Sequence, residues 1–174
     1  MKLYTFDNGD GVKRVGVELS GFPGLIRDVR DFGLPYRDMT DLIRRITPSE
    51  KERISDPEAA LDGRPLRLSS VRVCSPIPHP EQDIICLGVN YAAHADESAQ
   101  FDRKAFLLDR KKATYFSKRA YQTSGPDDLI PSYPELVTSL DYEAELAVII
   151  GRDCKNVCER DAAACIFGYT VLND

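Results

Sequence analysis

The sequence predicts a mixed α/β fold that is rich in β-strands. Short apolar segments, some alternating with polar residues and some continuous, recur along the 174 residues, and short segments with helical spacing lie between them. Apolar residues make up 43% of the chain and charged residues 29%, which is the mix of an ordinary globular protein. The length favours one domain or two small ones.

Composition also excludes several classes of protein. The net charge of −5 gives no basic face for nucleic acid. No window approaches the roughly 18 to 20 apolar residues that a membrane span needs, and residues 1–7 lack the apolar core of a signal peptide. Five cysteines, an odd number, argue against a disulfide framework. We therefore expect a cytoplasmic protein with no nucleic-acid or membrane partner.

The spacing of the cysteines argues against structural zinc as well. Cys154 and Cys158 are four positions apart, unlike a zinc knuckle, and the chain has only two histidines. Cys74, Cys86 and Cys165 lie among Val, Ile and Leu, so we expect them to be buried as small apolar residues.

Residues 1–72 are predicted to form a small α+β module. Strands are expected at residues 2–6 and 12–19, joined by a hairpin turn at the Asn-Gly and Asp-Gly pairs between them. Apolar residues at i, i+3, i+4 and i+7 predict a helix over residues 38–46, with Asp38 or Thr40 as its N-cap. A second short helix should follow Thr47-Pro48-Ser49-Glu50, then a turn at 62–65 and one alternating strand at 66–73.

Residues 73–174 are predicted to form a second region, entered through the proline-rich, extended segment 75–80. The continuous apolar run at 83–89 predicts a buried strand. The further elements expected are a helix from 90–97, an amphipathic segment at 101–112, strands at 114–118, 140–150 and 168–172, and a helix at 161–167.

Two carboxylates open the predicted strand at 140–150. Side chains alternate faces along a strand, so Glu143 and Glu145 point the same way, with Cα atoms roughly 7 Å apart. Their face continues with Ala147 and Ile149 and so becomes apolar. A hard divalent cation would relieve their repulsion, because Mg²⁺, Mn²⁺ and Ca²⁺ all take oxygen ligands. The alternative is a solvated strand end with two ordinary surface acids.

Two further segments could contribute polar groups. His94 and Glu97 stand three apart, directly after the predicted strand at 83–89, and a carboxylate beside an imidazole can make it a general base. The alternative is a helix cap, with Asn90 as the cap and the pair merely exposed. Asp174 ends the apolar strand at 168–172 and could complete a metal site, or could belong to an ordinary Asn-Asp turn.

Taken in order, these blocks resemble the fumarylacetoacetate hydrolase (FAH) family. The resemblance covers residues 83–174 strongly and 1–72 loosely, since many members of the family carry a small module before the catalytic domain. The blocks that carry it are Gly88-Val89-Asn90-Tyr91 with His94 and Glu97, Phe116-Ser117-Lys118, Asp141-Tyr142-Glu143-Ala144-Glu145-Leu146 with Val148-Ile149-Ile150-Gly151, and Gly168-Tyr169-Thr170-Val171-Leu172-Asn173-Asp174.

The resemblance implies a catalytic domain with a mixed β-sandwich roll, like a β-barrel, and a divalent cation, Mg²⁺, Mn²⁺ or Ca²⁺. The family's metal ligands map to Glu143, Glu145 and Asp174, and its water-activating dyad maps to His94 and Glu97. Lys118 matches a lysine near the substrate, although Arg119 replaces the proline that usually follows it. The implied reaction is hydrolysis of a C–C bond in a 1,3-dicarbonyl or acylpyruvate-type oxo-acid, through a metal-bound enolate.

The same resemblance leaves other reactions open. The family includes isomerases of the 5-carboxymethyl-2-hydroxymuconate type, oxaloacetate decarboxylases and keto-deoxy sugar acid hydrolases or dehydratases, and fold alone does not choose among them. A non-catalytic protein with the same fold is a further alternative. A small oxo-acid substrate and a homodimer are expected. Because the chain stops at a predicted ligand, Asp174, we also expect only the first half of the catalytic domain here, with a continuation beyond it.

Overall fold

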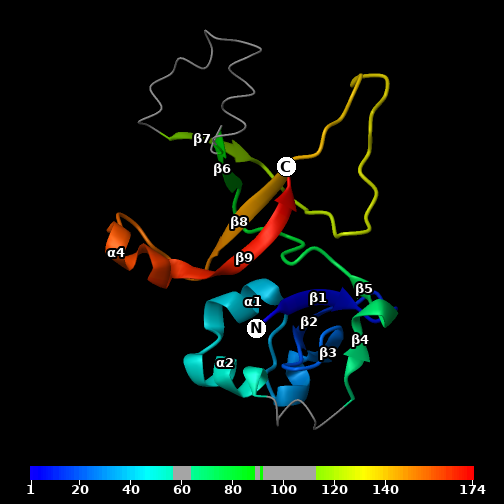
Figure 1. The fold of residues 1–174 in the computed structure, drawn as a ribbon, viewed down its shortest axis with the longest axis vertical. Helices are drawn as coiled ribbons and strands as arrows, with labels where there is room; N and C mark the ends of the chain where they lie inside the picture. The colour runs from blue at the N-terminus through cyan, green and yellow to red at the C-terminus, as the bar shows by residue number, and fades with distance from the viewer. Residues whose placement is uncertain (57–63, 89–90, 92–112) are drawn as a thin grey trace. The chain divides into compact units, whose positions relative to one another are not determined.

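The computed structural model of the chain describes residues 1–56, 64–88, 91 and 113–174, and it confirms a mixed α/β, sheet-rich protein (Figure 1). Its contacts form two units. One comprises Met1–Pro78 with Ser124–Asp174, and the other is His79–Thr123. The domain boundary between residues 72 and 73 stays a prediction.

A five-stranded antiparallel sheet forms the N-terminal part. Its strands are β1 (Leu3–Asp7), β2 (Lys13–Glu18), β3 (Leu25–Asp28), β4 (Leu66–Arg67) and β5 (Arg72–Val73), in the order β4-β3-β2-β1-β5. The predicted hairpin is confirmed, because β1 and β2 pair along their whole length. Glycines at positive φ form the turn between them, as a hairpin of this kind requires.

The single strand predicted at residues 66–73 is wrong. The 3₁₀ turn η2 (Leu68–Ser70) breaks it, so that β4 pairs with β3 at one edge of the sheet and β5 pairs with β1 at the other. In a flat sheet those edges would lie about 19 Å apart, more than the chain between Arg67 and Arg72 spans when part of it is helical. The sheet therefore curls, and one short segment closes both of its edges.

The helices of this part begin where the sequence predicts. After the 3₁₀ turn η1 (Val29–Phe32), α1 (Met39–Arg45) is capped by Asp38, whose carboxylate accepts the Asp41 backbone N–H at 2.8 Å. The next helix, α2 (Pro48–Ser55), starts with a capping box made by Thr47 and Glu50. The core lies between the sheet and these helices. Its buried members are Val15, Val17, Val29, Leu34, Tyr36, Met39, Leu42 and Ile54.

The unit His79–Thr123 contains one described ribbon, β6 (Ile84–Gly88) paired antiparallel with β7 (Thr114–Lys118). Both strands were predicted, but the prediction that the first of them is buried is wrong. Ile85 is 66% exposed and Leu87 45%, because only β7 pairs with this strand among the described residues. Cys86 is half-buried for the same reason, whereas Cys74 and Cys165 are buried as expected.

A second two-stranded ribbon lies at the C-terminal end of the described residues. It pairs β8 (Ala144–Ile150) with β9 (Ile166–Asn173), antiparallel, with a bulge at Ile149/Ile150. The helix predicted at 161–167 starts earlier and ends sooner, as α4 (Glu159–Ala162) and η3 (Ala163–Cys165), because Ile166 and Phe167 already belong to β9. Across the described ranges, no helix has the length and apolar character to cross a membrane.

Candidate functional site

Three acidic residues lie at neighbouring backbone positions at one end of the ribbon formed by β8 and β9, which Figure 1 draws in orange and red. Ala144 pairs with Asn173. The Asp174 backbone N–H donates to the Glu143 carbonyl oxygen at 2.9 Å, which extends the ladder by one step. Glu143 therefore stands opposite Asp174, and Glu145 lies two residues further along the same strand.

The pairing places the three carboxylates on one face. Residues opposite each other in an antiparallel pair point to the same side, as do residues i and i+2 of one strand. Glu145 and Asp174 are half-buried, and the same face continues through Ala147 and Thr170, which are also half-buried. The acids thus sit where the sheltered face of the ribbon begins.

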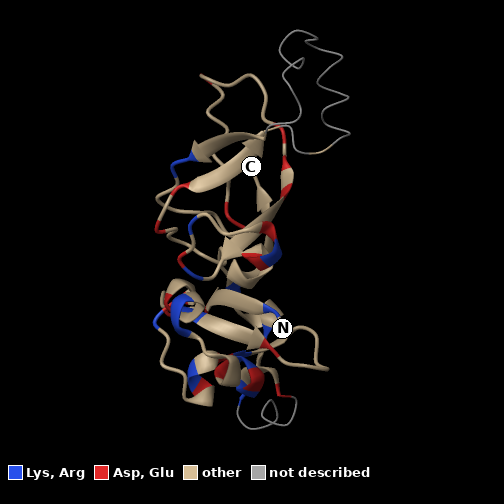
Figure 2. Ribbon diagram, turned by 90° about the vertical axis from the view of Figure 1, so that its left-hand side faces the viewer, with Lys and Arg blue, Asp and Glu red and all other residues tan. Residues whose placement is uncertain are grey.

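Two of the three acids have no basic partner among the described residues. Neither Glu143 nor Glu145 forms an ion pair with a Lys or Arg in the described ranges. In the N-terminal part, by contrast, acidic and basic residues lie close together and form several ion pairs (Figure 2). Two carboxylates on one face of a strand, such as those of Glu143 and Glu145, favour binding of a divalent cation through oxygen ligands.

The carboxylate groups themselves do not converge in this structure. Among the described residues, no group of three or more His, Cys, Asp or Glu side chains is arranged to hold a metal ion. The backbone therefore brings Glu143, Glu145 and Asp174 to adjacent positions on one face, while their side-chain oxygens are not gathered around one point. The carboxylate donors themselves fit a hard cation.

Asn173 is a member of this end of the ribbon that the sequence did not single out. Its side-chain oxygen accepts the Glu143 backbone N–H at 2.8 Å. This hydrogen bond holds the residue before β8 against the end of β9. The only signal in the sequence was its place before Asp174, which is equally typical of an ordinary turn.

The other predicted site residues belong to other segments of the chain. Lys118 is exposed at the end of β7, opposite Ile84, in the unit His79–Thr123. His94 and Glu97 lie outside the described residues. Glu143, Glu145 and Asp174 are thus the predicted residues that the pairing of β8 with β9 brings together.

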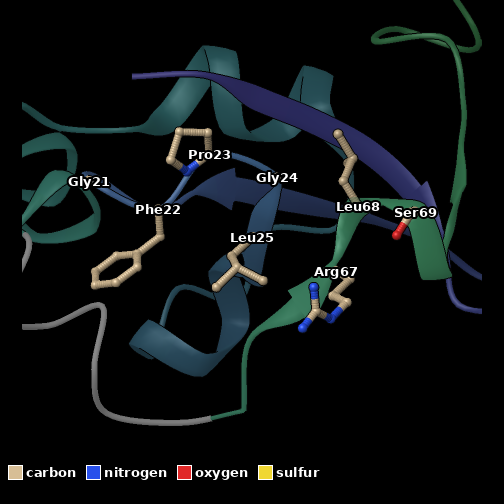
Figure 3. Close-up of a pocket in the computed structure, with 8 residues that line it drawn as sticks. All are labelled: Gly21, Phe22, Pro23, Gly24, Leu25, Arg67, Leu68 and Ser69. Atoms are coloured by element: carbon tan, nitrogen blue, oxygen red, sulfur yellow. The ribbon is translucent and has the colours of Figure 1, made fainter.

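A hollow of about 800 Å³ lies elsewhere, on the N-terminal part (Figure 3). Two turns form it, one before β3 and one at β4 and η2. Among the described residues, Arg67 is the only charged one that lines it, and no described acid or histidine does. The described lining therefore holds none of the carboxylate or imidazole groups that oxo-acid chemistry with a metal requires. Its side-chain lining is Phe22, Pro23, Leu25, Arg67, Leu68 and Ser69.

Comparisons with known proteins identify related chains. Residues 83–174 match the family described as fumarylacetoacetate (FAA) hydrolase C-terminal. Oxaloacetate tautomerase YisK of Bacillus subtilis is 38% identical over 107 residues, which cover 62% of this chain and 34% of that protein. The mitochondrial oxaloacetate tautomerase fahd2 of Xenopus laevis is 33% identical over 178 residues, covering 100% of this chain and 51% of that protein.

Solved structures are similar over the whole chain. A fumarylacetoacetate hydrolase from Exiguobacterium antarcticum has a TM-score of 0.72 at 29% identity and is covered to 55% of its length. The maleylpyruvate hydrolase of Sphingobium sp. SYK-6, solved with manganese(II) and pyruvate, has a TM-score of 0.67 at 29% identity and is covered to 58%. The chain thus spans about half the length of these structures, and a third to a half of the two curated relatives.

Proposed function

Because the chain belongs to the fumarylacetoacetate hydrolase family, we propose that it carries the divalent-cation site of an enzyme that acts on small oxo-acids. The observation that carries the proposal is the placement of Glu143, Glu145 and Asp174 on one half-buried face of the β8–β9 ribbon. The manganese in the similar maleylpyruvate hydrolase supports a cation of this kind. When bound, the cation would supply Lewis-acid polarisation of a carbonyl oxygen.

The residues of this chain would divide the remaining work. Glu143, Glu145 and Asp174 would hold the cation, and Asn173 would keep the start of β8 in register for them. His94, oriented by Glu97, would accept the proton that the reaction moves, and Lys118 would bind an anionic group of the substrate. These last three roles rest on the family resemblance alone.

Hydrolysis of a C–C bond in a 1,3-dicarbonyl or acylpyruvate-type oxo-acid is the first reaction we propose. It is supported by the similarity to two hydrolases over the whole chain. In this reaction His94 would take a proton from water, and the oxygen of that water would be added to the carbonyl carbon of the substrate. The C–C bond beside that carbonyl carbon would then break, and the leaving carbon would take up the proton. The products would be two smaller acids.

Tautomerisation of an oxo-acid is the second candidate. It is favoured by two relatives that are oxaloacetate tautomerases, at 38% and 33% identity. The same base would then move a proton between carbon and oxygen, and no water would be consumed. Acylpyruvates and enol-oxaloacetate, offered separately, distinguish the two reactions. Two acid fragments in the product mixture indicate hydrolysis, whereas loss of enol absorbance with unchanged substrate mass indicates tautomerisation.

The cation site is tested by binding before any substrate is needed. We expect the Glu143→Gln/Glu145→Gln variant to bind Mn²⁺ far more weakly than the unchanged chain, by isothermal titration calorimetry. Loss of an outer-shell partner alone commonly costs about 10- to 100-fold in metal affinity, so loss of two ligands should cost no less. Glu135→Gln is the matched control, because Glu135 is an exposed acid in a turn of the same unit.

Equal affinity in the double variant and the control would refute the site. If no divalent cation binds the unchanged chain, the proposal of a metal-dependent enzyme fails and the non-catalytic alternative gains support. The proton-transfer role has its own test in turnover. His94→Ala should keep Mn²⁺ affinity and lose about 10²- to 10⁴-fold in rate, the usual contribution of a general base.

A further inference from the structure

The described lining of the hollow on the N-terminal part shares no residue with the proposed cation site (Figure 3). Its volume of about 800 Å³ lies within the range of about 300–1,000 Å³ that is usual for small-molecule sites. Arg67 and Ser69 contribute a cation and a hydroxyl group, and the other side chains of the described lining are apolar, those of Phe22, Pro23, Leu25 and Leu68. An apolar wall with a few polar groups is the usual composition of a ligand site.

The wall formed by the turn before β3 is held by its backbone. The Phe22 N–H donates to the Leu19 carbonyl oxygen at 3.0 Å, and the Leu25 N–H donates to the Phe22 carbonyl oxygen at 3.1 Å. Gly21 and Gly24 have φ values of 80° and 78°, which such a tight turn requires of them. The Phe22 side chain is 44% exposed. A fixed backbone therefore presents this ring to the hollow.

The second wall, at β4 and η2, is joined to the first by backbone contacts. The Leu68 N–H donates to the Gly24 carbonyl oxygen at 2.8 Å. Leu25 pairs with Arg67 across β3 and β4, so the side chains of these two residues point to the same face of the sheet. In Figure 3 the side chains of Phe22, Leu25 and Arg67 extend to the same side. The pairing thus places a cation and a ring along one apolar face.

Arg67 carries a charge that no described acid balances through an ion pair. Its side chain is exposed. Glu18 is the acid bonded to the neighbouring turn, where its carboxylate accepts the Gly24 N–H at 3.0 Å, and the Lys2 ammonium lies 3.0 Å from the same carboxylate and balances it. Other arginines of the N-terminal part pair with acids, namely Arg14, Arg30 and Arg45. The described surroundings of Arg67 therefore suit an anionic ligand.

We propose that this hollow binds a small monocarboxylic acid with an aromatic body. The Arg67 guanidinium would donate paired hydrogen bonds to the two carboxylate oxygens. The body would lie on Phe22 and Leu25, where contact between rings adds to the effect of the area removed from water. The described lining offers one cation, so a single negative charge suits it better than a phosphate monoester, which carries about 1.5 to 2 charges at neutral pH.

Nuclear magnetic resonance titration of the whole chain tests this site. The probe is 3-phenylpropionate, and EDTA in the buffer removes divalent cations, so that the result does not depend on the proposed cation site. We expect saturable shifts of backbone amide signals from both walls, those of Gly21, Gly24, Leu25, Leu68 and Ser69. Propionate lacks the ring and 3-phenylpropan-1-ol lacks the charge, so each should bind more weakly than the probe. Phenyl phosphate tests the choice of head group and should also bind more weakly.

Two substitutions at exposed side chains remove the two parts of the site. Arg67→Gln should weaken 3-phenylpropionate binding by about 1.5- to 5-fold, the range for an exposed ion pair, and leave the affinity for 3-phenylpropan-1-ol unchanged. Phe22→Ala should weaken the binding of both compounds, by about 2- to 12-fold from the loss of the ring contact alone. Arg53→Gln is the matched control, because Arg53 is an exposed arginine of α2 outside the lining and its removal changes the net charge equally.

Several results would overturn the proposal. One is the absence of saturable shifts at these amides up to the solubility limit of 3-phenylpropionate, and another is a set of shifts confined to other parts of the chain. Equal affinity for 3-phenylpropionate and 3-phenylpropan-1-ol would show that the charge is not recognised. Equal affinities of the Arg67→Gln and Arg53→Gln variants would exclude Arg67 as the partner of the carboxylate. Tighter binding of phenyl phosphate would contradict the choice of a carboxylate.

Discussion

Replacing Gly151 with alanine tests the close packing of Gly151 against Phe167 in the β8–β9 ribbon. A Cβ at this position would lie 2.9 Å from the Phe167 Cβ, 3.3 Å from its Cα and 3.4 Å from its nitrogen. These are backbone or near-backbone atoms that cannot rotate away. Phe167 is itself held, because it packs against the N-terminal core and the Lys51 ammonium lies 4.8 Å from the centre of its ring.

Gly168 provides a matched control in the same ribbon. A Cβ there would meet nothing within 4 Å, and neither glycine has a positive φ. Overpacking of a tight contact costs roughly 1–3 kcal/mol, whereas Gly→Ala at an unstrained position stabilises by about 0.4–1 kcal/mol. The free energies of unfolding of the two variants should therefore differ by about 1.5–4 kcal/mol.

Urea unfolding followed by circular dichroism measures this difference. In a chain of this size, 1 kcal/mol corresponds to about 2–4 °C in Tm, so Gly151→Ala should melt roughly 2–12 °C below the unchanged chain. Gly168→Ala should melt at the same temperature or slightly higher. If both alanine variants unfold at the same urea concentration with the same slope, Gly151 and Phe167 are not packed as the structure has them.

Three further predictions concern the N-terminal part. Leu42→Ala should lower the free energy of unfolding by about 2–5 kcal/mol in urea denaturation, because Leu42 is fully buried in the core. Thr47→Ala should lower it by about 1 kcal/mol through loss of the capping box, and Thr47→Ser should restore most of it. The backbone N–H of Gly24 and then the Lys2 ammonium hold the pKa of Glu18 below its ordinary 4.5, so stability should fall as pH drops through that depressed pKa. Glu18→Gln should flatten this fall below about pH 4.5 in urea titrations.

The local signals in the sequence predicted the elements better than their partners. The Asn-Gly and Asp-Gly pairs and the capping residues Asp38 and Thr47 act within a few residues of themselves, so the hairpin and both helices could be placed. The segment 66–73 has an equally good strand pattern. Its division between β4 and β5 depends on two distant strands, β3 and β1, which no local pattern reveals.

Burial was harder to predict for a related reason. A continuous apolar run such as residues 83–89 indicates that a strand has apolar neighbours on both faces, but it does not say which segments provide them. Within the described structure β6 pairs only with β7, so Ile85 and Leu87 are exposed. The pattern identified the strand correctly and could not identify what covers it.

For the candidate metal site, too, the sequence predicted what depends on one strand and not what depends on the pairing of two. The i, i+2 spacing of Glu143 and Glu145 was sufficient to put both on one face, because alternation is a property of the single strand. That Asp174 joins them depends on the register between β8 and β9, which pairs Ala144 with Asn173. From its place at the end of a strand, Asp174 could be a metal ligand or part of an ordinary Asn-Asp turn, and the family resemblance favoured the ligand. The sequence did not indicate the hydrogen bond that Asn173 makes.

The placement of the three acids on one face depends on the pairing register of β8 and β9. A slip of one residue along β9 would turn every side chain of that strand to the opposite face and would remove Asp174 from the side that carries Glu143 and Glu145. Two contacts oppose such a slip, the Asn173–Glu143 hydrogen bond at the acidic end and the Gly151–Cys165 hydrogen bond at the other. The two contacts lie on opposite sides of the bulge at Ile149/Ile150, where the pairing shifts by one residue, so each fixes the alignment on its own side. The geometry of the acids thus depends on the Asn173–Glu143 hydrogen bond and on the unshifted pairs from Ala144↔Asn173 to Ile149↔Gly168.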